Sequence, residues 1–62
     1  MADDSIRHGY ITVAGHRHEV SWHTISHEVY VHCRNWWYAG KAYSFDEALD
    51  TASSYLRSKG WS

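Results

Sequence analysis

The sequence lacks the features that stabilise many small proteins or hold them in membranes. Its 62 residues include one cysteine and no proline. A disulfide within the chain is therefore excluded, and no proline interrupts a strand or a helix. It also has no apolar run long enough to span a bilayer and no signal-peptide pattern. Because a single thiol is typical of a reducing compartment, we expect a cytoplasmic protein.

A strong charge of either sign is also missing. Six Lys and Arg residues against seven Asp and Glu residues give a formal net charge of −1, with six histidines counted as neutral. A domain that binds nucleic acid mainly through phosphate contacts, or an acidic mimic of DNA, would carry a far larger net charge. Aromatic residues are abundant instead, with four Trp, five Tyr and one Phe. Since aromatic side chains bury the most area per residue, they can supply much of a small core.

Residues 6–43 show the alternation of antiparallel strands. The predicted strands cover residues 6–13, 16–22, 28–34 and about 36–43. Ala14 and Gly15 form the predicted hairpin turn between the first two, because glycine accepts a positive φ. The turn before the fourth strand stays open, since both Arg34-Asn35 and Ala39-Gly40 are turn-like.

Residues 44–59 are predicted to form a helix. Ser44 and Glu47 have the spacing of a capping box, in which each side chain accepts a hydrogen bond from a free backbone N–H at the helix start. Gly60 is suited to a left-handed C-terminal cap. The whole chain is therefore predicted to be one α+β domain: an antiparallel sheet of three to four strands with one C-terminal helix packed on one face. Residues 1–5 are expected to be flexible.

Strand pairing assigns side chains to the two faces of the predicted sheet. The helix is expected to cover the more apolar face, formed by Ile11, Val13, Val20, Trp22, Val29, Val31 and Cys33. On the fourth strand Lys41 should point to solvent, which places Trp36 and Tyr38 under the helix and Trp37 on the open face. The reverse assignment holds if that strand begins later, because a one-residue shift exchanges the faces.

The open face is the candidate binding surface, because it combines aromatic and basic side chains. The candidate binding residues are Tyr10, Arg17, Tyr30, His32, Arg34, Trp37, Lys41 and Tyr43. Tyr30, Trp37 and Tyr43 are the expected apolar anchors. Three interpretations remain: a merely soluble face with cross-strand aromatic pairs, a protein-docking or self-association face, and a nucleic-acid face on which rings stack against bases. We favour protein binding.

Metal binding and catalysis receive less support from the sequence. His16, His18 and Cys33 share one predicted face, but they lack the paired spacing of a zinc site, so whether they bind metal stays open. Cys33 is expected to be a small core residue rather than a nucleophile. No phosphate loop, dinucleotide motif or carboxylate pair is present. We therefore expect a protein that is not an enzyme and has no cofactor or metal.

The stretch Lys41-Ala-Tyr-Ser-Phe-Asp-Glu-Ala-Leu-Asp-Thr-Ala, which ends at Ala52, resembles a strand-to-helix junction of several small domains. These are the phage-encoded inhibitors of bacterial RNA polymerase, the HicB-like antitoxins and the arm-binding domains of phage integrases. The resemblance implies a small phage or mobile-element protein that inhibits or regulates by binding. Its partner would be a protein of host transcription or defence, as for an anti-CRISPR-like inhibitor, and a homodimer is a variant of this prediction.

Overall fold

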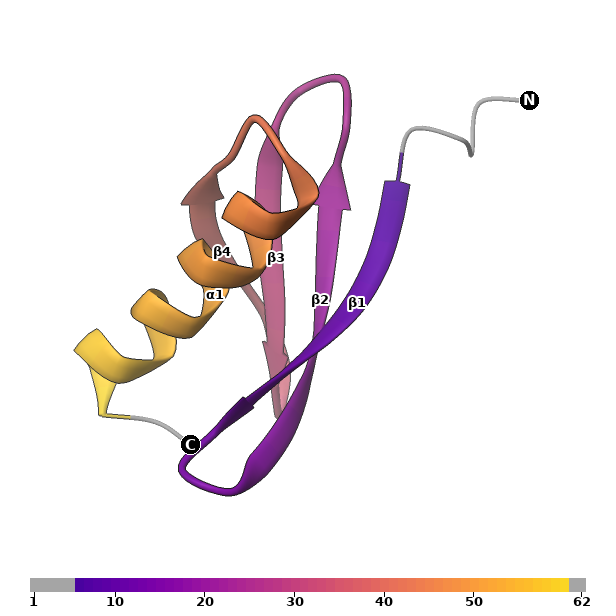
Figure 1. Cartoon of the computed structure of the whole chain (residues 1–62). Coiled ribbons are helices and arrows are strands. Elements are labelled where there is room, and N and C mark those ends of the chain that lie inside the picture. The colour runs from indigo at the N-terminus through magenta and orange to yellow at the C-terminus, as the bar shows by residue number, and fades with distance from the viewer. Residues whose placement is uncertain (1–5, 61–62) are drawn as a thin grey trace.

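A computed structural model describes residues 6–60 as a four-stranded antiparallel sheet with one helix across it (Figure 1). The strands lie in the order β1-β2-β3-β4, and α1 follows them in the chain. Their bounds are β1 Ile6–Val13, β2 His16–His23, β3 Glu28–Cys33, β4 Asn35–Lys41 and α1 Phe45–Lys59. The predicted α+β fold is confirmed, whereas the flexibility expected of residues 1–5 lies outside the described residues.

The β1–β2 hairpin has the predicted turn and register. Val13 is opposite His16, and the two turn residues Ala14 and Gly15 both have positive φ, 53° and 82°. Such a type I′ turn matches the right-handed twist of the strands on either side of it. All eight residues of β1 are paired with β2 without a shift, so the predicted parity of both strands is correct.

The β3–β4 pair departs from the predicted alternation. The two strands meet at a tight turn at Arg34, whose φ is 71°, and Cys33 is opposite Asn35. Farther along, Lys41 pairs with Glu28, Gly40 with Val29 and Tyr38 with Tyr30, so that Ala39 is an extra residue on β4. This β-bulge reverses the face of every β4 residue that precedes it.

The bulge overturns the expected faces of the three adjacent aromatic residues. Trp37 is opposite Val31, a fully buried residue, and therefore lies on the helix side of the sheet. Trp36 and Tyr38 lie on the open face and are 47% and 49% exposed. Lys41 does point to the open face, as expected, but the extra residue cancels the parity that was counted back from it.

The predicted ends of α1 are confirmed. Ser44 Oγ accepts a hydrogen bond from the Glu47 N–H at 3.2 Å, and Glu47 Oε1 accepts one from the Tyr43 N–H at 2.8 Å. The carboxylate thus binds one residue earlier than in a standard capping box. At the other end Gly60 is left-handed, with φ 74°, and its N–H is directed at the carbonyls of Leu56 and Arg57.

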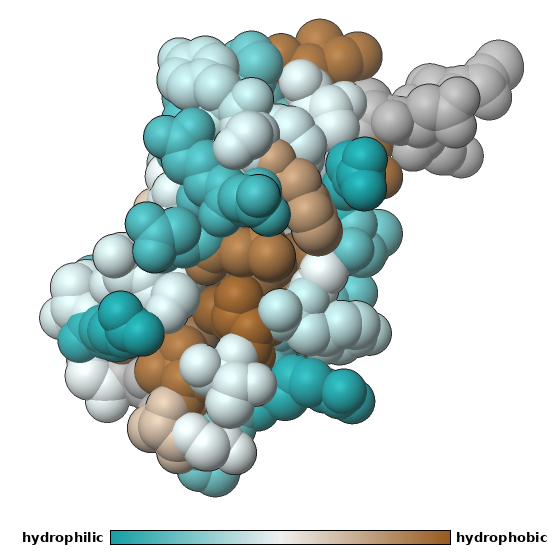
Figure 2. All heavy atoms as spheres, in the orientation of Figure 1, coloured by the Kyte–Doolittle hydropathy of each residue, from teal (hydrophilic) through white to brown (hydrophobic). Residues whose placement is uncertain are grey.

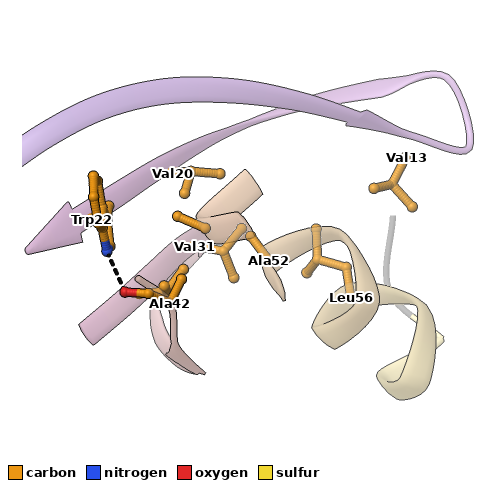
Figure 3. Packing of buried hydrophobic residues seen from close by; sticks show 9 residues of the cluster. Val13, Val20, Trp22, Val31, Ala42, Ala52 and Leu56 are labelled. Carbon is orange, nitrogen blue, oxygen red and sulfur yellow. Dashed lines mark hydrogen bonds between the residues drawn. The ribbon is translucent and has the colours of Figure 1, made fainter. Parts of the chain in front are cut away.

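The core lies between α1 and one sheet face (Figure 3). Its members with no exposed surface are Val20, Val29, Val31, Ala42, Ala48, Ala52 and Leu56. The indole of buried Trp22 donates from Nε1 to the Ala42 carbonyl at 2.9 Å. This bond ties the middle of the sheet to the segment that leads into α1, because Ala42 directly follows β4.

Gly9 lets the start of α1 approach β1 closely. A Cβ at this position would lie 2.6 Å from Cζ of Phe45 and 3.2 Å from a methyl of Leu49. Both side chains are only partly buried, and so is Ile11 on β1. Figure 2 shows the result as a hydrophobic strip that stays visible between α1 and β1. The helix therefore does not fully cover the apolar side of β1.

Candidate functional site

The open face of the sheet carries two neighbouring groups of contacting aromatic rings, which we together call the aromatic band. It consists of His23, Tyr30, His32, Trp36 and Tyr38. Tyr30 has His23 on one side, with ring centroids 5.3 Å apart, and Tyr38 on the other at 5.6 Å. Rings of neighbouring strands that meet edge to face hold one another in place.

The second half of the band is a pair of rings on β3 and β4. His32 and Trp36 are opposite each other, with centroids 5.0 Å apart and an interplanar angle of 64°. Although it packs on His32, the Trp36 side chain keeps nearly half of its surface exposed. The band thus presents large aromatic surface on a sheet, where the backbone is held by strand pairing.

An open depression lies beside the band and extends toward β1. Its lining residues are His8, Ser21, His23, Tyr30 and Trp36. Ser21 is only 8% exposed although no helix covers this face, so the surrounding rings themselves shield the middle of the sheet. A partner side chain placed here would contact rings on one side and a small hydroxyl beneath.

The charges of the open face balance within residues 6–60. Arg17 and Lys41 are its cations, and Glu19 and Glu28 its anions. The Arg17 guanidinium lies 4.9 Å from the centroid of the Tyr10 ring, and His8 Nδ1 is 3.2 Å from a Glu19 oxygen. The face was expected to combine aromatic and basic side chains. Because Glu19 and Glu28 lie on the same face, its formal charge is zero when the histidines are counted as neutral.

Tyr30 is the central residue of the band. Its hydroxyl donates to Glu28 Oε1 at 3.2 Å. Partial desolvation among the neighbouring rings raises the pKa of the Tyr30 phenol, and the negative charge of Glu28 raises it further. The Tyr30 side chain is thus a neutral hydrogen-bond donor that is already occupied by Glu28, and its ring is the part left for contact.

Five of the eight predicted binding residues share this face: Tyr10, Arg17, Tyr30, His32 and Lys41. The other three do not. Arg34 is in the β3–β4 turn, and Trp37 lies on the helix side, where its indole donates to the Cys33 carbonyl at 3.0 Å. Tyr43 follows β4 and is 71% exposed, with its ring 4.4 Å from that of His27.

Sequence reasoning missed Trp36 and Tyr38 as members of the open face. The available signal is Ala39-Gly40, which the sequence analysis treats only as a possible turn. Glycine within a strand also marks bulges, and Gly40 has a φ of 143° at this one. A bulge there exchanges the faces of both aromatic residues.

The histidines and the cysteine outside the face do not form a metal cluster within residues 6–60. His18 is buried, and its Nδ1 lies 3.1 Å from the His32 carbonyl. Cys33 is a partly buried free thiol that packs against the core. His18 thus joins β2 to β3, and Cys33 contributes to packing.

No family model, curated protein or solved structure matches this chain. In the part of the chain that the structure describes, no helix has both the length and the hydrophobicity needed to cross a bilayer.

Proposed function

We propose that this protein is a non-enzymatic binding module that forms a stoichiometric complex with a protein partner through the open face of its sheet. One observation carries the proposal. Tyr10, Trp36 and Tyr38 are 58%, 47% and 49% exposed on a single sheet face. Trp, Tyr and Arg dominate the energetics of protein interfaces, and surface aromatic groups held in place lose little entropy on binding.

The charges of the face favour a protein partner over nucleic acid. Arg17 stacks on Tyr10, and Lys41 is opposite Glu28, so neither cation belongs to a row of basic groups. A strand of nucleic acid needs a positively charged path along its backbone. A protein interface instead needs an apolar centre with mixed charges at its rim, which is the composition found here.

The biological role rests on the resemblance of residues 41–52 to phage-encoded and mobile-element proteins. On that basis we propose an inhibitor or regulator, similar to phage inhibitors of RNA polymerase or to anti-CRISPR proteins, that acts on a larger host protein. The cytoplasmic setting stays a prediction from the single free Cys33. Self-association through the open face, which would bury the same rings, also stays a prediction.

Adjacent tryptophans on opposite faces offer a matched test. Immobilised wild-type protein, Trp36→Ala and Trp37→Ala would each be used to capture partners from lysate of the source cells. Circular dichroism would first verify that both variants are folded. We expect a protein that is captured by wild type and Trp37→Ala and is lost with Trp36→Ala. Equal capture of the partner by the two variants would contradict binding through the open face.

A salt series with single-stranded DNA and RNA tests the nucleic-acid alternative. Binding through phosphate contacts weakens steeply as salt rises. We expect no measurable affinity for either nucleic acid at low salt. Tight, salt-sensitive binding that is lost in Trp36→Ala would contradict the proposed protein partner and would identify nucleic acid as the ligand of the open face.

A further inference from the structure

The two edges of the sheet differ in how open they are to another strand. β4 carries the bulge at Ala39 and ends in Lys41, and both features discourage edge-to-edge pairing. β1 has eight residues in unbroken register, without bulge, proline or lysine. Its one formally charged side chain, Arg7, lies with its guanidinium 4.9 Å from the centroid of the Phe45 ring. β1 thus lacks the bulge, the proline and the lysine that commonly protect an edge strand.

The hairpin geometry identifies the backbone groups on the outer side of β1. In a two-residue hairpin the residues that flank the turn, here Val13 and His16, form a hydrogen-bonded pair. Hydrogen-bonded and open pairs then alternate, so the N–H and C=O groups of Ile6, His8, Tyr10 and Thr12 point away from β2. These groups have no partner within residues 6–60.

The hydrophobic strip of Figure 2 runs along the same edge. Ile11 on β1 and Phe45 and Leu49 on α1 are partly buried apolar side chains that pack against the core from these two elements. A strand added beside β1 would satisfy the free backbone groups and cover this strip at the same time. Two independent features thus point to a fifth strand at this position.

We infer that the occupant is β1 of a second copy, which pairs antiparallel about a twofold axis at Gly9. In this register His8 is opposite Tyr10 of the second copy, and Arg7 is opposite Ile11 of the second copy. Because Phe45 and Leu49 lie directly over Gly9, the two copies bring these four apolar side chains together above the paired Gly9 residues, which have no side chains. The strip of each copy covers that of the other.

The charges also suit a second copy. The net charge of each chain is only −1, so the copies repel each other weakly. The two Arg7 side chains are separated by four residues along the seam, or about 13 Å, which exceeds the screening length of about 8 Å at physiological salt. A seam centred on Tyr10 would instead bring two Tyr10 rings together. Because an Arg17 guanidinium lies 4.9 Å from the centroid of each ring, that register would also bring two positive charges together.

The dimer would form one eight-stranded sheet with both aromatic bands on the same side. Neither band takes part in the seam, so the inference does not depend on the proposed function. If both hold, the binding surface is twofold symmetric and has two equivalent sites.

Amide hydrogen exchange of the full, untagged chain tests the pairing directly. In the dimer the amides of His8, Tyr10 and Thr12 become protected as protein concentration rises, together with a sedimentation mass that approaches twice 7.2 kDa. In a monomer only the alternate amides of Arg7, Gly9, Ile11 and Val13 are protected. A monomeric mass with unprotected His8, Tyr10 and Thr12 at about 1 mM protein would overturn the inference, because it excludes all but very weak pairing.

Two substitutions of His8 distinguish the contribution of its backbone N–H to dimerisation from that of its side chain. His8→Pro removes an outward N–H that the hairpin does not use, whereas His8→Ala keeps it, and both lose the contact with Glu19. We expect His8→Pro to be monomeric and His8→Ala to dimerise. Equal association of the two folded variants would contradict the seam. If His8→Pro fails to fold, the exchange pattern of the native chain decides.

Discussion

Gly9→Ala is the sharpest test of how the helix covers the sheet. The added Cβ would lie 2.6 Å from Phe45 Cζ and 3.2 Å from Leu49 Cδ2, so the helix must shift or the ring must turn. Overpacking of this kind costs about 1–3 kcal/mol, against about 0.5–1 kcal/mol gained when alanine replaces glycine in a strand. We therefore expect the free energy of unfolding to fall by about 1 kcal/mol, and by at most about 2.5 kcal/mol. A loss of about 1 kcal/mol lowers the Tm by roughly 4–8 °C in a domain of this size.

Urea and thermal unfolding, followed by circular dichroism at one fixed protein concentration, would measure this loss. Thr12→Ala on the open side of the same strand is the control, and it should change the free energy of unfolding by less than about 0.5 kcal/mol. In a Phe45→Leu background, which lacks the clashing Cζ, the cost of Gly9→Ala should shrink. A Gly9→Ala protein as stable as wild type or more stable would refute the close approach of α1 to β1.

Two further predictions concern single groups. Trp22→Phe removes the donor for the buried Ala42 carbonyl, and leaving that carbonyl unpaired should cost about 1–3 kcal/mol in urea unfolding; an unchanged midpoint would contradict the bond. For Tyr30, the raised pKa of the phenol in the folded state means that its contribution to stability is complete below the unfolded pKa of about 10 and is lost as pH rises through the folded pKa. The stability difference between wild type and Tyr30→Phe should therefore shrink above that pH in alkaline unfolding curves, and a difference that grows there would show the sign to be wrong.

The local elements followed closely from the sequence because each depends on neighbouring residues. The capping box at Ser44 and Glu47 predicts the start of α1, and Gly60 its end. In the first hairpin, Ala14-Gly15 and the alternation on both sides of it agree on one register. Local geometry and apolar pattern point to the same structure in these parts of the chain.

The fourth strand could not be assigned in this way. Trp36, Trp37 and Tyr38 are all large and aromatic, so alternation of polarity favours neither face. The face is decided by the extra residue at Ala39, which is a property of the β3–β4 pairing and not of β4 alone. The position of Tyr43 differs from the prediction for a related reason, because β4 ends at Lys41 and strand alternation no longer applies at Tyr43.

The central claim is that the aromatic band of the open face, and not exposed aromatic surface in general, binds the partner. Tyr38→Ala and Tyr43→Ala make the same change at two exposed tyrosines, one inside the band and one outside it. Titration calorimetry against the captured partner should give a dissociation constant raised about 30-fold for Tyr38→Ala, corresponding to about 2 kcal/mol, and nearly unchanged for Tyr43→Ala. Equal affinities of the two variants, or a larger loss for Tyr43→Ala, would contradict the account.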